Sequence, residues 1–235
     1  PSNGKEVMAL KGAGNKVNSL QVAKNMARIA LVLWVFDSRE KWDTGRVMVR
    51  ELPSGRIIFD VQQSGFPVRQ VAISPNGEYV FAASSCLQVG ASEGKLVCWS
   101  IERKERLWST NAICGGLAMS PDGKMLAYGS GSRIVLCDVP SGTTLSSARY
   151  GSHTIDAVTF ADDGTFIAIG AADGAVAVWK LLRSHEETGP GHKSDVGCVR
   201  DAPKSSIGAS RTHPTQLPGT SSGRGLAGSA GKKKR

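Results

Sequence analysis

The sequence lacks any apolar segment long enough to cross a membrane. Its longest apolar run, Ile29–Phe36, is far shorter than the ~20 residues that a transmembrane helix needs, and we interpret it as a buried strand. The 5 cysteines form no Cys-x-x-Cys pair, and the sequence contains no signal-peptide pattern. An odd number of cysteines without a signal peptide indicates a reducing compartment. We therefore expect a cytoplasmic or nuclear protein without membrane contact.

The sequence also lacks the residue patterns of a metal or catalytic site. None of the 4 histidines belongs to an HxxxH or HExxH motif, and no acidic cluster accompanies them. The glycines fall at expected hairpin turns, and not between a strand and a helix, where a phosphate would bind. Ser92–Lys95 fits a Ser-x-x-Lys pattern, but its alignment with Ala172–Ala175 places it in an exposed turn. We expect no catalytic residue, no metal and no cofactor, and so no enzyme.

Aromatic residues are scarce, at 6% of the chain, whereas 28 residues are glycine. This composition suits an all-β protein with many tight turns. A pattern recurs about every forty residues: an apolar strand, a turn of Ser-Pro-Asp-Gly type, a second strand, a glycine turn, and a third strand ending near Trp. Val71–Gly77 leads in this way to Leu96–Trp99, and Val158–Gly164 leads to Val176–Trp179. Such repeats are typical of propeller blades.

Equivalent positions align in successive repeats. In Pro75–Gly77 and Pro121–Gly123 the proline fixes φ, and Asn or Asp with Gly completes the turn. We expect three glycines to open the turn into the third strand: Gly45, Gly94 and Gly174. The core position of the first strand falls at Leu20, Val71, Leu117 and Val158, and a further match at Val199 begins another repeat.

On these residues the sequence resembles the WD40-repeat β-propeller family, over most of 1–182 and more weakly from 191 to about 210. The resemblance implies an all-β fold with four recognisable four-stranded blades. We place the blades at 1–61, 62–110, 111–150 and 151–182, and the degenerate start of a further blade at 183–210. Propellers of this family usually close with more blades, and the chain begins at Pro1 in mid-pattern. We expect an incomplete propeller, part of a longer chain or completed by a partner.

The repeats depart from the family pattern in their polar residues. No Trp-Asp dipeptide is present. Asp173 and Trp179 match two members of the hydrogen-bonded set of His, Asp, Ser or Thr, and Trp that family members often share. His153, however, lies too close to Ile155 for the usual spacing. We expect these blades to be held by packing more than by that polar set.

Most of the positive charge lies in the C-terminal part of the chain. Residues 1–182 contain 19 basic and 16 acidic residues, a net of +3, whereas 183–235 contain 10 and 4, a net of +6. From 211 to 235 the chain is rich in Gly, Ser, Thr and Pro, and we expect this tail to be disordered. It ends in Lys232, Lys233, Lys234 and Arg235. This cluster is interpreted as a solvated tail, a nuclear-import signal, a contact to RNA or acidic surfaces, or a retrieval signal.

The connections between second and third strands hold the candidate partner contacts. An enlarged loop in the first repeat carries Arg39, Lys41 and Trp42, and an exposed Trp beside Arg is typical of binding hot spots. Gln88–Gly94 and Arg133 are further candidates. Ile101–Trp108 mixes both signs of charge, and we interpret it as a solvent-facing hairpin between third and fourth strands.

The resemblance implies a non-catalytic scaffold that binds other proteins in a multiprotein assembly. One alternative is a nucleic-acid-associated scaffold, nuclear or ribonucleoprotein, whose basic tail adds electrostatic affinity for RNA. A propeller hydrolase is a further alternative, because the fold alone does not exclude catalysis.

Overall fold

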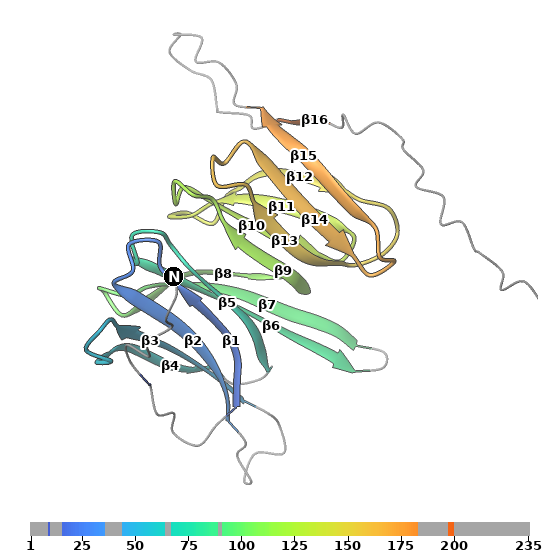
Figure 1. The fold of residues 1–235 in the computed structure, drawn as a ribbon. Coiled ribbons are helices and arrows are strands. Elements are labelled where there is room, and N and C mark those ends of the chain that lie inside the picture. The colour runs from blue at the N-terminus through green and yellow to red at the C-terminus, as the bar shows by residue number, and fades with distance from the viewer. Residues whose placement is uncertain are drawn as a thin grey trace, which may run out of the picture. The chain divides into compact units, whose positions relative to one another are not determined.

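The computed structural model consists of β-strands arranged in four antiparallel sheets (Figure 1). It describes residues 9, 16–35, 44–63, 67–88, 91–182 and 197–199. The described residues form no helix, so none of them belongs to a helix that could cross a membrane. The all-β fold predicted from the sequence is confirmed.

Each sheet consists of four strands in chain order, with each strand paired to the next. The first sheet contains β1 (Lys16–Val22), β2 (Arg28–Val35), β3 (Thr44–Glu51) and β4 (Ile57–Gln63). The second contains β5 (Val68–Ile73), β6 (Tyr79–Gln88), β7 (Ala91–Ser100) and β8 (Glu105–Asn111). The third contains β9 (Cys114–Met119), β10 (Met125–Ser130), β11 (Arg133–Asp138) and β12 (Thr144–Arg149). The fourth contains β13 (Ile155–Phe160), β14 (Phe166–Ala171), β15 (Val176–Leu182) and β16 (Gly197–Val199).

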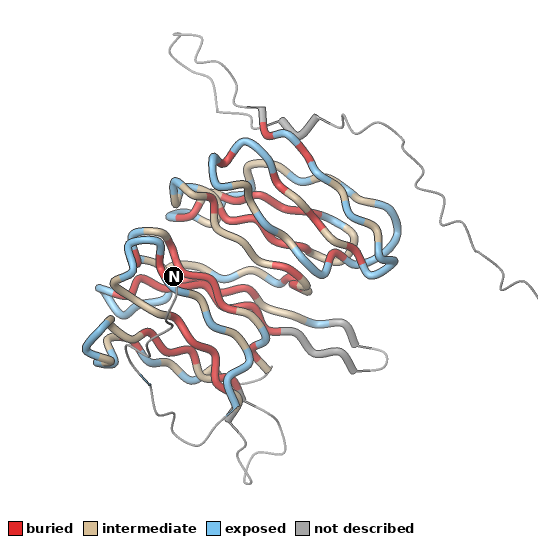
Figure 2. Tube along the Cα trace, in the orientation of Figure 1, coloured by how far each residue is buried: buried red, intermediate tan, exposed pale blue. Residues whose placement is uncertain are grey.

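The first strands of successive sheets lie side by side, β1 against β5, β5 against β9 and β9 against β13. Successive side chains of a strand point to opposite faces of the sheet, so a sheet between two others needs apolar residues on both faces. In β6, Val80 and Ala82 pack toward the first sheet, whereas Phe81 and Ala83 pack toward the third. Figure 2 shows the resulting runs of buried residues along the strands. This arrangement of consecutive blades is the one that the repeats predict.

The fourth strand of the last sheet comes from an unexpected part of the sequence. The repeat alignment predicts that Val199 begins a further blade within 183–210. In the structure Val199 lies in β16 and pairs with Lys180 of β15. Pairing with β16 supplies partners for the backbone groups along one edge of β15, which would otherwise be left open. The predicted tail 211–235, with Lys232–Arg235, lies outside the described residues.

The turn between first and second strands is stabilised by a buried serine. In the third sheet, Ser120 donates from Oγ to Asp122 Oδ1 at 2.6 Å and accepts from the Met125 amide at 2.9 Å. Ser74 makes the same two contacts in the second sheet, with Asn76 and Tyr79. Local hydrogen bonds of this kind fix the turn without help from distant residues.

Ser120→Ala is expected to lower the free energy of unfolding by about 1 kcal/mol, because the Met125 amide loses its acceptor. The fourth sheet offers the matched control, since Ala161 takes the equivalent place there and its amide donates to Phe166 O at 3.0 Å. Ala161→Ser should be neutral or stabilising. Urea unfolding followed by tryptophan fluorescence measures both changes, and equal midpoints for the two variants would contradict the role of the serine.

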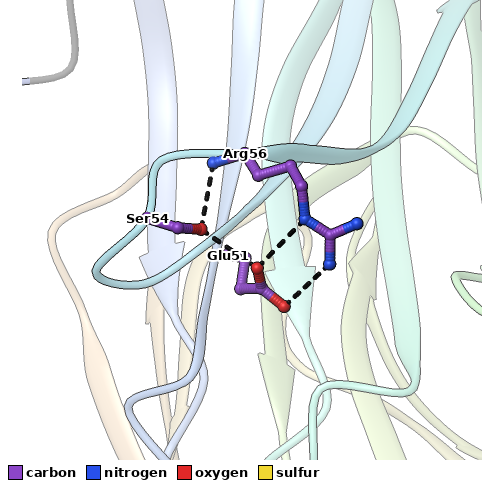
Figure 3. Close-up of polar contacts among 3 residues, drawn as sticks. All are labelled: Glu51, Ser54 and Arg56. Atoms are coloured by element: carbon purple, nitrogen blue, oxygen red, sulfur yellow. Dashed lines mark hydrogen bonds and ion pairs between the residues drawn. The ribbon is translucent and has the colours of Figure 1, made fainter.

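The turn between third and fourth strands is closed by an acidic residue. In the first sheet, Glu51 accepts from Ser54 Oγ at 3.0 Å and from Arg56 Nε at 3.2 Å and Nη2 at 3.1 Å (Figure 3). These hydrogen bonds, from Arg56 first and then from Ser54, lower the pKa of Glu51. The third sheet repeats the arrangement, with Ser141 Oγ donating to Asp138 Oδ2 at 2.6 Å.

Candidate functional site

The sequence-predicted partner contacts belong to connections between second and third strands. Arg39, Lys41 and Trp42 precede β3 but lie outside the described residues. Arg133 begins β11, is exposed, and donates from Nη2 to Ser147 Oγ at 2.8 Å. The structure therefore places Arg133 on an accessible strand end. Its role in partner binding stays a prediction.

The described residues of Gln88–Gly94 belong to strands, where the sequence predicts a loop between the second and third strands. β6 continues to Gln88 and β7 starts at Ala91, with Gln88 opposite Ala91 and Cys86 opposite Glu93. The Ser92–Lys95 segment thus lies in a paired ladder, and its interpretation as an exposed turn is wrong. The alignment with the fourth sheet misplaces it because the β6–β7 pairing runs further than the β14–β15 pairing, which ends at Gly170 opposite Val176.

His153 does contact Asp173, although its spacing in the sequence argues against this. His153 Nδ1 lies 3.3 Å from Asp173 Oδ2, and Ser152 Oγ lies 3.4 Å from the same nitrogen. A catalytic triad needs the acid and the hydroxyl on opposite ring nitrogens, which this arrangement does not provide. The pair instead links the entry to β13 with the turn between β14 and β15. Both side chains are more than one-third exposed, so the contact adds little stability.

The sequence predicts that Gly45, Gly94 and Gly174 lie in turns, but only one of the three does. Gly174 has a positive φ of 81° in a turn, as predicted. Gly45 and Gly94 instead lie within β3 and β7. A Cβ on Gly45 would overlap the side chain of Val68, and a Cβ on Gly94 would overlap the carbonyl oxygen of Ala112. Gly45 permits close approach of the second sheet, and Gly94 permits close approach of the connection between β8 and β9.

Three thiols are buried between the second and third sheets: Cys98, Cys114 and Cys137. Burial raises the pKa of Cys114 and of Cys137 to about 12, and raises that of Cys98 as well. A protonated thiol is a poor nucleophile and a poor metal ligand. Across the described part of the chain, no cluster of His, Cys, Asp and Glu is arranged to hold a metal ion.

The two terminal sheets expose apolar side chains that the middle sheets bury. Leu96, Ile134 and Val176 occupy equivalent positions on the face toward the following blade, and they are 0%, 1% and 73% exposed. Val178 on the same face is 50% exposed. On the first sheet, Leu20 is 59% exposed, so its predicted place in the core is wrong: it points away from the second sheet. Among the described residues, no strands of the first and fourth sheets pack together.

Comparisons with known proteins agree with this architecture. Residues 140–180 match the family described as WD domain, G-beta repeat. The chain is 35% identical over 85 residues to the mouse (Mus musculus) intraflagellar transport protein 122 homolog, a match covering 35% of this chain and 7% of that protein. It is 30% identical over 82 residues to the target of rapamycin complex subunit wat1 of Schizosaccharomyces pombe, covering 34% of this chain and 26% of the relative.

The same fold occurs in a solved structure. The β-propeller domain of Cps50 (Swd1) from Myceliophteria thermophila superimposes with a TM-score of 0.59 at 15% identity. The superposition covers 80% of this chain and 59% of that one. The chain therefore spans only part of the length of the proteins that it matches.

Proposed function

Because the chain belongs to the WD40-repeat β-propeller family, we propose that it is a non-catalytic scaffold that binds other proteins in a multiprotein assembly. Relatives of this family include a protein named as a complex subunit, which supports protein partners in general. The observation that carries the proposal is the exposure of large apolar side chains on the outward faces of the first and fourth sheets, among them Leu20, Val176 and Val178.

The proposed occupant of these faces is a further four-stranded β-sheet, supplied by a longer chain or by a partner. In the middle sheets the same register positions are covered by such a sheet, as Leu96 and Ile134 show by their burial. On β15, Val176 and Val178 lie on one face because they are two residues apart in a strand. Burying them against a sheet would remove apolar surface from water, which is favourable.

Isolated copies are expected to associate through these faces, with the average mass rising with concentration in size-exclusion chromatography with light scattering. Val178→Lys should reduce the association, because a charge would be buried in the contact. Thr144→Lys is the matched control: it adds the same charge at an exposed strand position of the third sheet. A chain that stays monomeric at all concentrations, or equal behaviour of the two variants, would overturn the proposal.

The alternative of RNA binding depends on Lys232, Lys233, Lys234 and Arg235, which lie outside the described residues. No observation on the described sheets favours it over protein binding.

A further inference from the structure

A groove of about 320 Å³ runs along the last strand of the first sheet. Five consecutive residues of β4, Ile57–Val61, line it together with Trp99, Lys104 and Arg106 of the second sheet. Successive side chains of a strand point to opposite faces, so five consecutive residues can line one space only along the backbone edge of the strand. β4 is the outermost strand of its sheet. Its outer edge has no strand partner among the described residues.

The floor of this groove is apolar and well packed. Phe59 and Trp99 are buried, and their ring centroids lie 6.1 Å apart with the planes tilted by 56°. Ile57 stays 46% exposed at the end of the strand. A rigid aromatic floor beside an open strand edge suits an extended segment that places alternate side chains against it.

The groove carries a net positive charge. Its one acidic lining residue is Asp60. Arg46 donates to this carboxylate from Nε at 2.6 Å and also from Nη2. Lys104 and Arg106 are exposed, and neither side chain makes a hydrogen bond or ion pair in the described part of the structure. Two unpaired cations above an apolar floor complement an acidic ligand.

The backbone at Lys104 gives independent support. Lys104 has a positive φ of 55°, in the turn between β7 and β8. The equivalent turns of the first and third sheets hold Gly55 and Gly142 at this position, each with a φ of 70°. A lysine is strained where glycine is not. Lysine in place of glycine therefore puts a cationic side chain at the groove at the cost of backbone strain.

We propose that the edge of β4 binds an acidic, extended peptide as an additional strand. Its backbone would pair with the open edge between Ile57 and Val61, and its acidic side chains would lie against Lys104 and Arg106. The proposal rests on the proposed scaffold function in that the ligand is a protein segment. It uses a surface separate from the terminal faces, so Val178→Lys tests the scaffold contact and leaves the groove intact.

Fluorescence anisotropy with a labelled peptide of alternating Glu and Val tests the proposal. Binding should weaken with salt, and a peptide with Lys in place of Glu should not bind. Lys104→Gly and Arg106→Gln are each expected to weaken binding about three- to fivefold, as exposed ion pairs do. Lys124→Gln, which removes an exposed lysine from a turn of the third sheet, is the matched control and should leave the affinity unchanged.

Two further measurements separate the proposal from its alternatives. Lys104→Gly should raise the midpoint of thermal unfolding by about two to four degrees through relief of strain, so weaker binding cannot be ascribed to unfolding. Two further peptides carry N-methyl groups, one on its odd-numbered residues and the other on its even-numbered residues. Only one of the two should lose binding, because only one set of amides faces β4. Unchanged affinity in both groove variants, or equal binding of both N-methylated peptides, would overturn the proposal. Competition by a single-stranded RNA would overturn it in favour of nucleic acid.

Discussion

Gly116→Ala is expected to lower the free energy of unfolding by about 3 kcal/mol, because the third and fourth sheets could no longer approach as closely. Gly116 lies in β9, against β13. A Cβ at this position would lie 2.7 Å from both the carbonyl carbon of Ala157 and the amide nitrogen of Val158. These are backbone atoms of a paired strand, and they cannot rotate away as the end of a flexible side chain can. Relief requires a shift of the whole strand.

Gly170→Ala is the matched control for this variant. Gly170 lies in β14, and a Cβ there would meet the Ala157 side chain at an ordinary 3.5 Å. Without a clash, the loss of backbone freedom in the unfolded chain should make this change neutral or stabilising by up to about 1 kcal/mol. Urea unfolding gives the free energies. Equal destabilisation by the two variants would show that the close approach of β9 to β13 does not limit stability.

Hydrogen exchange shows which sheets lose stability in the Gly116→Ala variant. If Gly116→Ala separates the sheets, amides of 155–182 should lose protection, while amides of 68–111 keep theirs because the first and second sheets pack through a separate cluster. Uniform loss of protection would mean that the four sheets unfold as one unit.

The features predicted correctly from the sequence are those fixed by local interactions. The turns at Pro75–Gly77 and Pro121–Gly123 depend on serine, Asn or Asp, and glycine within a few residues of each other. Alternating apolar residues then define strands, and their recurrence at a fixed period defines blades. Each of these signals lies within one repeat, so the fold class and the four sheets could be predicted without knowledge of contacts between repeats.

The features predicted wrongly depend on contacts between residues far apart in the sequence. Gly45 and Gly94 resemble turn glycines in an alignment. The reason for glycine is the Val68 side chain of the next sheet at Gly45, and the backbone of the β8–β9 connection at Gly94. Leu20 has the periodicity of a core residue, but none of the described sheets covers it. Val199 matches the start of a blade, whereas the open edge of β15 determines where it pairs.

The groove could not be predicted from the sequence either, because it too depends on contacts between repeats. The mixed charges of Ile101–Trp108 predict a solvent-facing hairpin. Lys104 and Arg106 line a groove only because β4, from the preceding repeat, lies beside them. One signal in the sequence could have indicated Lys104: its alignment with Gly55 and Gly142 places a lysine where two other repeats have glycine.

Raising the pH from 9 to 10 is expected to lower the free energy of unfolding by about 3 kcal/mol. The cause is the burial of Cys98, Cys114 and Cys137, which raises the pKa of all three thiols, to about 12 for the latter two. An unfolded thiol ionises near pH 8.5. Between pH 8.5 and about 12 the thiols of the unfolded chain have lost protons that the folded chain still holds, so alkali favours unfolding. Each thiol contributes about 1 kcal/mol over this interval.

The pH window follows from the sign of the shift. Because the folded pKa values are raised, the stabilisation is complete below about pH 8.5 and is lost progressively up to about pH 12. Burial raises the pKa of Tyr128 to about 12 as well, which steepens the loss above pH 10. Replacing all three cysteines with alanine should lower stability at pH 7 through cavities in the core, but should flatten its dependence between pH 9 and 10. Urea unfolding at fixed pH values measures this slope. If the slope is the same with and without the thiols, their burial between the second and third sheets is not what makes the protein sensitive to alkali.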